Sequence, residues 1–359
     1  MKVVLPLGSI GWKGGDNYVE SLRFALQNLE KEKKVKLVKY KPFETFMSKF
    51  EKLLSPRNRE IVAYQLYGHR AVNLPWPIVA KKRKPIFWIP DVQDLDLPGN
   101  FDGSELTRRH DERVGIIRRG GYFYFSSNSI QTKFSKSYPT AKILGTIRFT
   151  SNLSFVGADQ NSTENLCQCI DSKNFMYAPN QWWIHKNHKT LIDAYNVYRL
   201  EGGTRHLTLT GPQNDSRRPE LEQEILELIN SSPYEIHNFG LASRELQTTL
   251  FLNCAYVVQV SNYEGWSTIV EEALKFQKML VLSDIEVHRE QLQGEFLAKF
   301  CDSNDPNSIS KTLHEMDREE SSHRCNYLLR EQRFQDDILE LLKRYRNRRL
   351  KDFPLRRSH

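Results

Sequence analysis

The feature that most constrains this chain is the alternation of short apolar runs with helical patterns, which occurs in two series. The first series predicts a helix from Tyr18 to about Leu29 and strands at Val3–Leu7, Val35–Tyr40, Ile61–Leu66, Pro85–Ile89, Tyr122–Ser126 and Lys142–Ile147. Residues 151–172 are then rich in Ser, Asn, Gln and Asp without a clear period, which indicates a linker. Because strands that alternate with helices form mainly parallel sheets, the first series predicts an α/β domain.

A second series of the same kind follows the linker. It predicts helices at His188–Arg199, Ser243–Asn253 and Ser267–Gln277, another from Pro219, and strands at Asn174–Ala178, His206–Thr210, Tyr234–Phe239, Ala255–Val260 and Met279–Ser283. We therefore expect two doubly wound domains, residues 1–172 and 173–335, that face a central cleft. Residues 336–359 are expected to form a helix and a basic tail that pack back on the first domain. Ligands of such domains bind at the carboxyl ends of the strands.

The distribution of charge argues against a nucleic-acid binder, although the isoelectric point is about 9.1. The net charge of +8 consists of +11 in residues 1–180, −10 in residues 181–342 and +7 in residues 343–359. An acidic half would repel a polyanion, so we expect no nucleic-acid partner. A non-enzymatic binding protein with a basic tail remains an alternative.

Cysteine usage and hydropathy indicate a cytoplasmic protein. The 5 cysteines are odd in number and lack a repeating spacing, which favours a reducing compartment. Cys167 and Cys169 have no second pair nearby, so a metal site there is not expected. No run approaches the ~18 apolar residues of a membrane span, and the run Val3–Leu7 is interpreted as a strand, not as a signal peptide.

The most informative segment follows the expected strand Ala255–Val260. A loop there carries Glu264, and a helix is expected to begin near Ser267 or Thr268. The free N–H groups of a helix amino end bind anions such as phosphate, and the carboxylates of Glu264 and Glu272 suit sugar or ribose hydroxyls. From spacing alone, an acidic pair that only complements the helix dipole is an equally good interpretation.

This segment resembles the retaining GT-B glycosyltransferases of family four, the glycosyl transferases group 1. Their two glutamates lie in an E-G-F-G-x-x-x-x-E-A setting, and this chain has Trp and Ser in place of Phe and Gly. The resemblance implies that Glu264 faces the donor hexose and that Glu272 holds the nucleotide ribose, with Glu271 a competitor one residue out of register. The intervening amides, from Gly265, Trp266, Ser267 and Thr268, would reach the sugar and phosphate of the donor.

The resemblance extends over most of the second half. Lys186, five residues ahead of Leu191, stands where the family places a phosphate-binding lysine. The arginine that many members carry a few residues earlier is missing. Gly211 and residues 239–240 match strand ends near the nucleotide base. His185 and His188 are interpreted as structural histidines, because no carboxylate partner accompanies them.

The first half carries a thinner resemblance. Gly14 and Gly15 look like part of the glycine loop that lets backbone approach the donor diphosphate. Asp91 lies in a segment that resembles the acceptor side of a subgroup, and Asp94 stands where that subgroup has His. Residues 94–96 also form a D-x-D triplet, the metal motif of the GT-A fold. A metal there is not expected, because it cannot be reconciled with a donor site in the second half.

The resemblance implies a retaining, metal-independent transfer of a hexose from a nucleotide diphosphate sugar to a glycan or lipid-linked acceptor, without a cofactor. Lys186, the Gly14 and Gly15 amides and the helix end near Ser267 would stabilise the leaving diphosphate. A sugar-nucleotide epimerase of similar fold is the enzymatic alternative. The pattern of residues 332–349 predicts an amphipathic helix whose basic end would meet an anionic membrane surface, here the inner membrane face, or would only be solvated.

Overall fold

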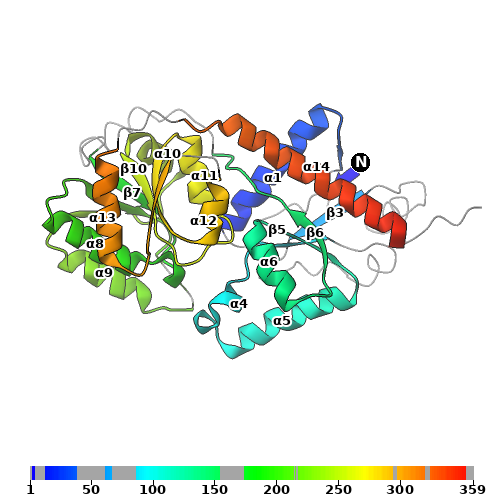
Figure 1. Cartoon of the computed structure of the whole chain (residues 1–359), viewed down its shortest axis with the longest axis horizontal. Helices are drawn as coiled ribbons and strands as arrows, with labels where there is room; N and C mark the ends of the chain where they lie inside the picture. The colour runs from blue at the N-terminus through cyan, green and yellow to red at the C-terminus, as the bar shows by residue number, and fades with distance from the viewer. Residues whose placement is uncertain are drawn as a thin grey trace, which may run out of the picture. The chain divides into compact units, whose positions relative to one another are not determined.

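The computed structural model describes residues 2–4, 13–38, 61–66, 86–153, 174–213, 215, 217–293, 297–319 and 324–352. They form two compact units, each built on a six-stranded sheet (Figure 1). The first unit comprises residues 1–92, 102–152 and 328–359, and the second comprises residues 93–101 and 153–327. No described helix is both long enough and apolar enough to span a membrane.

The first unit has the strand order β2-β1-β3-β4-β5-β6, with neighbouring strands parallel throughout. Its strands are β1 (Lys2–Val4), β2 (Lys36–Val38), β3 (Ile61–Leu66), β4 (Ile86–Ile89), β5 (Tyr122–Phe125) and β6 (Lys142–Thr146), and its helices are α1 (Lys13–Lys31), α5 (Gly103–Arg118), α6 (Asn128–Ser137) and most of α14 (Tyr327–Asp352). All residues of β4 and β5 are buried, as expected for the centre of a parallel sheet. Tyr18 of α1 stacks on Trp88 of β4 with ring centroids 3.8 Å apart, which packs α1 against the sheet.

The second unit has the strand order β12-β11-β10-β7-β8-β9, again parallel throughout. Its strands are β7 (Phe175–Pro179), β8 (His206–Thr210), β9 (Ile236–Asn238), β10 (Tyr256–Gln259), β11 (Met279–Ser283) and β12 (Ala298–Cys301). Its helices are α4 (Gln93–Asp96), η1 (Pro98–Asn100), η2 (Ile184–Lys186), α8 (His188–Leu200), α9 (Leu221–Ser231), α10 (Arg244–Asn253), α11 (Thr268–Lys275), α12 (Glu286–Gln291) and α13 (Pro306–Asp317). This strand order is that of a Rossmann fold, and its topological switch point lies between β7 and β10.

Alternating side chains of the second sheet enter two separate cores. Met176 and Ala178 of β7 pack with α8, α9 and α13 on one face, and α8 and α13 lie side by side there (Figure 1). Phe175 and Tyr177 of the same strand pack with α10 and α11 on the other face. Because successive residues of a strand point to opposite faces, a fully apolar strand requires helices on both sides. The α/β class and the two Rossmann-like domains expected from the sequence are therefore confirmed.

Helix α1 begins earlier than the sequence pattern predicts. It starts at Lys13, whereas the prediction placed its start at Tyr18, so Gly14 and Gly15 lie in its first turn and not in a loop. Glycine is a poor helix former, which is why the pattern indicated a loop. The remainder of the predicted glycine loop falls in residues 5–12, which lie outside the described residues.

The unit boundaries also differ from the predicted ones. The prediction divided the chain after residues 172 and 335, whereas the compact units divide it after residues 152 and 327. Residue 335 lies inside α14, a single helix, and the second unit includes the short segment 93–101. We call this segment, residues 93–101 with α4 and η1, the inserted segment.

Helix α14 packs on the first unit through one face. Phe334, Ile338 and Tyr345 are buried at helical spacing, and the Tyr345 ring lies edge-on to Tyr122 of β5, with centroids 5.4 Å apart. Arg148 also donates to Asp337 of α14 through Nε and Nη2, at 3.0 and 2.8 Å. The C-terminal helix is thus anchored by an apolar stripe and an ion pair. Residues 353–359 of the predicted basic tail lie outside the described residues.

Candidate active site

A lysine and a glutamate meet at the switch point of the second sheet. Lys186 ends η2, in the connection that follows β7, and Glu264 lies in the loop that follows β10. Lys186 Nζ donates to Glu264 Oε1 at 2.6 Å, and Gln259 Nε2 donates to the same oxygen at 2.6 Å. Only 13% of the Lys186 side chain and 7% of the Glu264 side chain are exposed. The pair therefore occupies the edge of the sheet where ligands of this fold bind.

The surroundings set the protonation of this pair and of its histidine neighbour. Burial is the largest single effect and raises the pKa of Glu264, but the charge and hydrogen bond of Lys186, together with His185 and His288, outweigh it and lower the pKa to about 2. Burial, assisted by the Lys186 charge, lowers the pKa of His185 to about 3. At neutral pH the site therefore holds an ionised carboxylate beside an uncharged imidazole.

Helix α11 begins where the sequence predicts, and a glutamine from α12 holds its amino end. Thr268 is the first helical residue, and Ser267 is the N-cap, whose Oγ accepts from Val270 N at 3.3 Å. Gln291 accepts from Ser267 N at 3.2 Å and donates to Ser267 O at 2.8 Å. The Ser267 amide is thus occupied by Gln291 in this structure. Gly265 and the largely buried Trp266 complete the loop from Glu264.

The two neighbouring glutamates of α11 have different partners. Glu271 is fully buried and accepts from Gln291 Nε2 at 2.9 Å. Glu272 is 2% exposed and accepts from Arg244 Nη1 of α10 at 3.1 Å. Glu271 is therefore tied to the Gln291 contact that holds the helix amino end, whereas Glu272 is paired with a partly exposed cation.

The loops that follow β7, β8 and β9 are tied together around Gly211. Its N–H donates to Gly240 O at 2.7 Å, and Trp182 N donates to Pro212 O at 2.9 Å. Gly211 has φ +137, and a Cβ built there would lie 2.1 Å from Asn180 O. Only glycine fits this close approach. A packing requirement therefore accounts for the glycine that the sequence comparison linked to the nucleotide base.

Comparison with known proteins finds a family model that matches the second half of the chain. Residues 170–332 match the family model described as Glycosyl transferases group 1. This match covers most of the second unit and a little under half of the chain. Lys186, Gly211, Glu264 and Glu272 all lie inside the matched range, whereas Gly14, Gly15 and Asp91 lie outside it. No curated protein sequence matches the chain significantly.

Several solved structures share the fold over nearly the whole chain. Sucrose-phosphate synthase from Thermosynechococcus elongatus is 12% identical with a TM-score of 0.67, and the alignment covers 98% of this chain and 99% of that one. A glycosyltransferase from Rickettsia africae is 13% identical with a TM-score of 0.60, and 99% of each chain is covered. A UDP-forming trehalose-phosphate synthase from Burkholderia xenovorans is 14% identical with a TM-score of 0.56, covering 87% of this chain and 77% of that one. At these identities the likeness establishes the fold.

Arg217, which no sequence pattern predicted as a site residue, joins the inserted segment to the rest of the second unit. Arg217 donates to both carboxylate oxygens of Asp215 at 2.9 Å and, through Nη1, to Gln93 Oε1 at 3.4 Å. Its guanidinium lies 5.3 Å from the Phe101 ring centroid and 5.4 Å from that of Trp183. No local motif surrounds Arg217, so the sequence carried no signal for this role.

The remaining predicted residues belong to different parts of the chain. Asp94 is buried in α4 of the inserted segment, within the second unit. Asp91, Gly14 and Gly15 belong to the first unit, so their roles toward a donor or acceptor remain predictions.

Three side chains on or next to β8 and β9 have the spacing of metal ligands. Among the described residues, His206, Glu235 and His237 offer ligand atoms that all lie within 4.8 Å of one another. They stand at the amino-terminal ends of two parallel strands, the opposite edge of the sheet from Lys186 and Glu264. This group is therefore separate from the candidate active site.

Proposed function

We propose that this protein is a retaining glycosyltransferase, which moves a hexose from a nucleotide diphosphate sugar to a hydroxyl of a glycan or lipid-linked acceptor. The observation that carries the proposal is the buried Lys186–Glu264 pair at the switch point of a group 1 domain. The similar trehalose-phosphate synthase is named as UDP-forming, which supports a nucleotide diphosphate as the leaving group here.

Lys186 and Glu264 would exchange partners when the donor binds. The ammonium of Lys186 leaves the carboxylate for the diphosphate, where it stabilises the negative charge that develops as the bond to C1 breaks. Glu264, released from Lys186 but still held by Gln259, accepts hydrogen bonds from hexose hydroxyls. Gly265, Trp266 and Thr268 line the donor side with backbone amides in this proposal.

Glu272 would bind the ribose of the nucleotide. Its carboxylate would accept hydrogen bonds from the ribose hydroxyls, and Arg244 of α10 fixes its orientation. Gly211 would bring backbone close to the base, and Gly14 and Gly15 would add amides of the first unit near the diphosphate. In this proposal these protein groups supply the positive charge, without a metal ion or cofactor.

The low pKa values of Glu264 and His185 support a reaction on one face of the sugar. A carboxylate with a pKa of about 2 and an imidazole with a pKa of about 3 are weak bases. The acceptor proton therefore passes to the leaving phosphate oxygen while the acceptor oxygen bonds to C1 on the side from which the phosphate departs. Configuration at C1 is retained. Asp91 is proposed as an acceptor-side catalytic residue.

The basic end of α14 would place the enzyme at an anionic membrane surface on the cytoplasmic side. Lys343, Arg346 and Arg348 are exposed there. Replacing these three residues by glutamate should reduce co-sedimentation with vesicles of anionic lipid without changing donor affinity. Equal sedimentation of both proteins would remove the membrane from the proposal.

A panel of nucleotide sugars tests the function. We expect one nucleotide diphosphate sugar to raise the melting temperature, and the anomeric configuration of its transfer product, determined by NMR, to match that of the donor. An inverted product would refute the retaining mechanism. Release of an epimerised nucleotide sugar without acceptor would identify an epimerase instead, and the absence of any stabilising nucleotide would overturn the proposal.

A further inference from the structure

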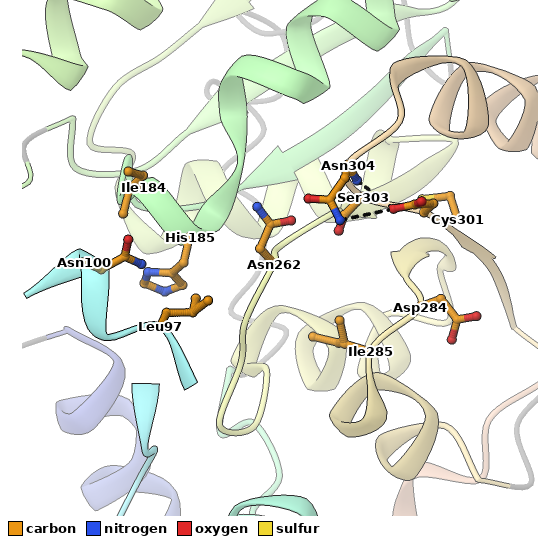
Figure 2. Close-up of a pocket in the computed structure, with 11 residues that line it drawn as sticks. Leu97, Asn100, Ile184, His185, Asn262, Asp284, Ile285, Cys301, Ser303 and Asn304 are labelled. Atoms are coloured by element: carbon orange, nitrogen blue, oxygen red, sulfur yellow. Dashed lines mark hydrogen bonds between the residues drawn. The ribbon is translucent and has the colours of Figure 1, made fainter. Parts of the chain in front are cut away.

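A large cavity lies over the carboxyl ends of β10, β11 and β12 in the second unit. It has a volume of about 700 Å³, within the range of ~300–1,000 Å³ typical of small-molecule sites. His185, next to Lys186, and Asn262, two residues before Glu264, form part of its wall. Figure 2 shows Asn262 between His185 on one side and Asn304 on the other. The cavity therefore begins beside the candidate active site and extends away over β11 and β12.

Two buried polar atoms of this wall lack partners. Among the described residues, neither His185 Nδ1 nor Asn262 Oδ1 has a hydrogen-bond partner. His185 is only 7% exposed, and its backbone oxygen accepts from Asn262 N at 2.8 Å, which holds the two residues together. Buried polar atoms are nearly always satisfied in native proteins, and a ligand that supplies hydrogen bonds in this cavity would use the unmet capacity of these two atoms.

The wall suits an uncharged, hydroxyl-rich ligand. It contains the amides of Asn100, Asn262 and Asn304 and the carboxylates of Asp284 and Asp302, and none of the described lining residues is lysine or arginine. Amides and a neutral imidazole both donate and accept, as sugar hydroxyls do. The aliphatic lining residues, Leu97, Ile184 and Ile285, suit the C–H faces of a sugar ring. Asp284 is paired with Arg289 outside the wall, so it is the carboxylate of Asp302 that disfavours a phosphate.

We propose that this cavity binds a neutral saccharide as the acceptor of transfer. The inference rests on the proposed function, and it chooses an uncharged glycan over a phosphorylated or diphosphate-linked acceptor. A saccharide seated between His185 and Asn304 presents a hydroxyl toward the loop of Glu264. Leu97 and Asn100 come from the inserted segment, so the Arg217 contacts help to form one side of the acceptor site.

The test compares two tryptophan variants of the full chain. Asn304 lines the cavity and Asn307, which does not line it, is exposed on α13, so Asn304→Trp fills the cavity and Asn307→Trp is its matched control. Saturation-transfer NMR with glucose, galactose, mannose and glucose 6-phosphate reports binding, and calorimetry with the stabilising nucleotide sugar reports the donor site. We expect at least one neutral sugar to bind the wild type more tightly than glucose 6-phosphate does. Asn304→Trp should abolish that signal, and both variants should bind the donor like the wild type.

The outcomes separate the two proposals. Donor binding without any neutral-sugar signal, an unchanged signal in Asn304→Trp, or tighter binding of glucose 6-phosphate would overturn the acceptor site and leave the transferase standing. Failure of the wild type to bind any nucleotide sugar would refute the proposed function itself. As a second variant, Asn262→Leu keeps the size of the side chain but removes the unpartnered amide, and it should weaken neutral-sugar binding about tenfold. Unchanged affinity in this variant would contradict the role of Asn262.

Discussion

Arg244 Nη1 of α10 lies 3.1 Å from Glu272 Oε1 of α11, so the first turn of one helix orients a buried carboxylate of the next. The Glu272 side chain is 3% exposed and that of Arg244 is 30% exposed, which leaves the guanidinium in reach of solvent. A ribose can therefore replace solvent near this pair without burying an unpaired charge. The proposed role of Glu272 depends on this arrangement as much as on its place in the motif.

Glu272→Ala should weaken the binding of the nucleotide sugar by about 10- to 100-fold, because ribose hydroxyls lose a charged acceptor worth ~1.5–3 kcal/mol. Isothermal titration calorimetry measures the effect. Glu245→Ala is the control, since Glu245 is exposed on α10 near the same arginine. Equal donor affinity in the wild type and Glu272→Ala would refute the ribose role.

Lys186→Met should lower both activity and stability. It leaves the buried Glu264 carboxylate without its cation, which costs ~3–5 kcal/mol in comparable pairs, and it removes the proposed phosphate contact. Denaturant unfolding should show that the double variant Lys186→Met, Glu264→Gln recovers part of the stability but not the activity. Lys189→Met is the control, because its pair with Glu224 is exposed and should change stability by less than ~1 kcal/mol. A Lys186→Met protein as stable as the control would contradict the pair's energetic role.

Stability should depend on pH through the buried histidines. Burial lowers the pKa of His188 from 6.5 to about 3, so the unfolded chain binds a proton there that the folded chain does not. The free energy of unfolding should therefore fall as the pH decreases from 6.5 toward 3, by up to ~1.4 kcal/mol per pH unit for each such histidine. His188→Gln should make this slope shallower in denaturant titrations between pH 6.5 and 4.5. An identical slope in the two proteins would show that His188 is not buried in its neutral form.

Gly211→Ala should destabilise the fold strongly. The added Cβ would meet Asn180 O at 2.1 Å, and φ +137 is unfavourable for alanine. Gly202→Ala is a matched control, because Gly202 also has a positive φ of +93 but nothing lies within 4 Å of its built Cβ. Thermal denaturation should show a loss of ~1–3 kcal/mol for Gly202→Ala from backbone strain and a larger loss for Gly211→Ala. Similar losses of stability in Gly211→Ala and Gly202→Ala would mean that the loops after β7 and β8 can move apart without a cost in free energy.

Arg217→Ala should loosen the inserted segment. Arg217 contacts Gln93 and the Phe101 ring, so its removal should speed hydrogen exchange in residues 93–101 while β7 and β10 stay protected. The adjacent Arg218→Ala serves as the control, because the Arg218 side chain is 43% exposed and, among its described contacts, forms an ion pair only with Glu220. If hydrogen exchange in residues 93–101 is equally fast in both variants, the Arg217 contacts do not stabilise the inserted segment.

The local sequence pattern was sufficient to predict much of the secondary structure. The strands β3, β8 and β11 have the predicted bounds, and α11 starts at the predicted position, because apolar periodicity, a Ser cap and Gly or Pro breaks are all encoded over a few residues. The Lys186 and Glu264 positions were found for the same reason, from motifs of adjacent residues. Helix α1 was placed too late, because its first-turn glycines are tolerated once the helix packs through Tyr18 and Trp88. The elements β12, α12 and α13 were not predicted.

The sequence by itself determined the two α/β units, the match of residues 170–332 to the group 1 family model and the residues that carry its motif. Only the tertiary structure decided which of them meet. Lys186 and Glu264 contact each other because β7 and β10 are neighbours at the switch point, and strand order depends on packing between distant segments. The contact of Gln291 with the start of α11 and the contact of Arg217 with the inserted segment likewise join residues that are distant in the sequence. Side-chain contacts of this kind depend on three-dimensional proximity, which no spacing along the chain encodes.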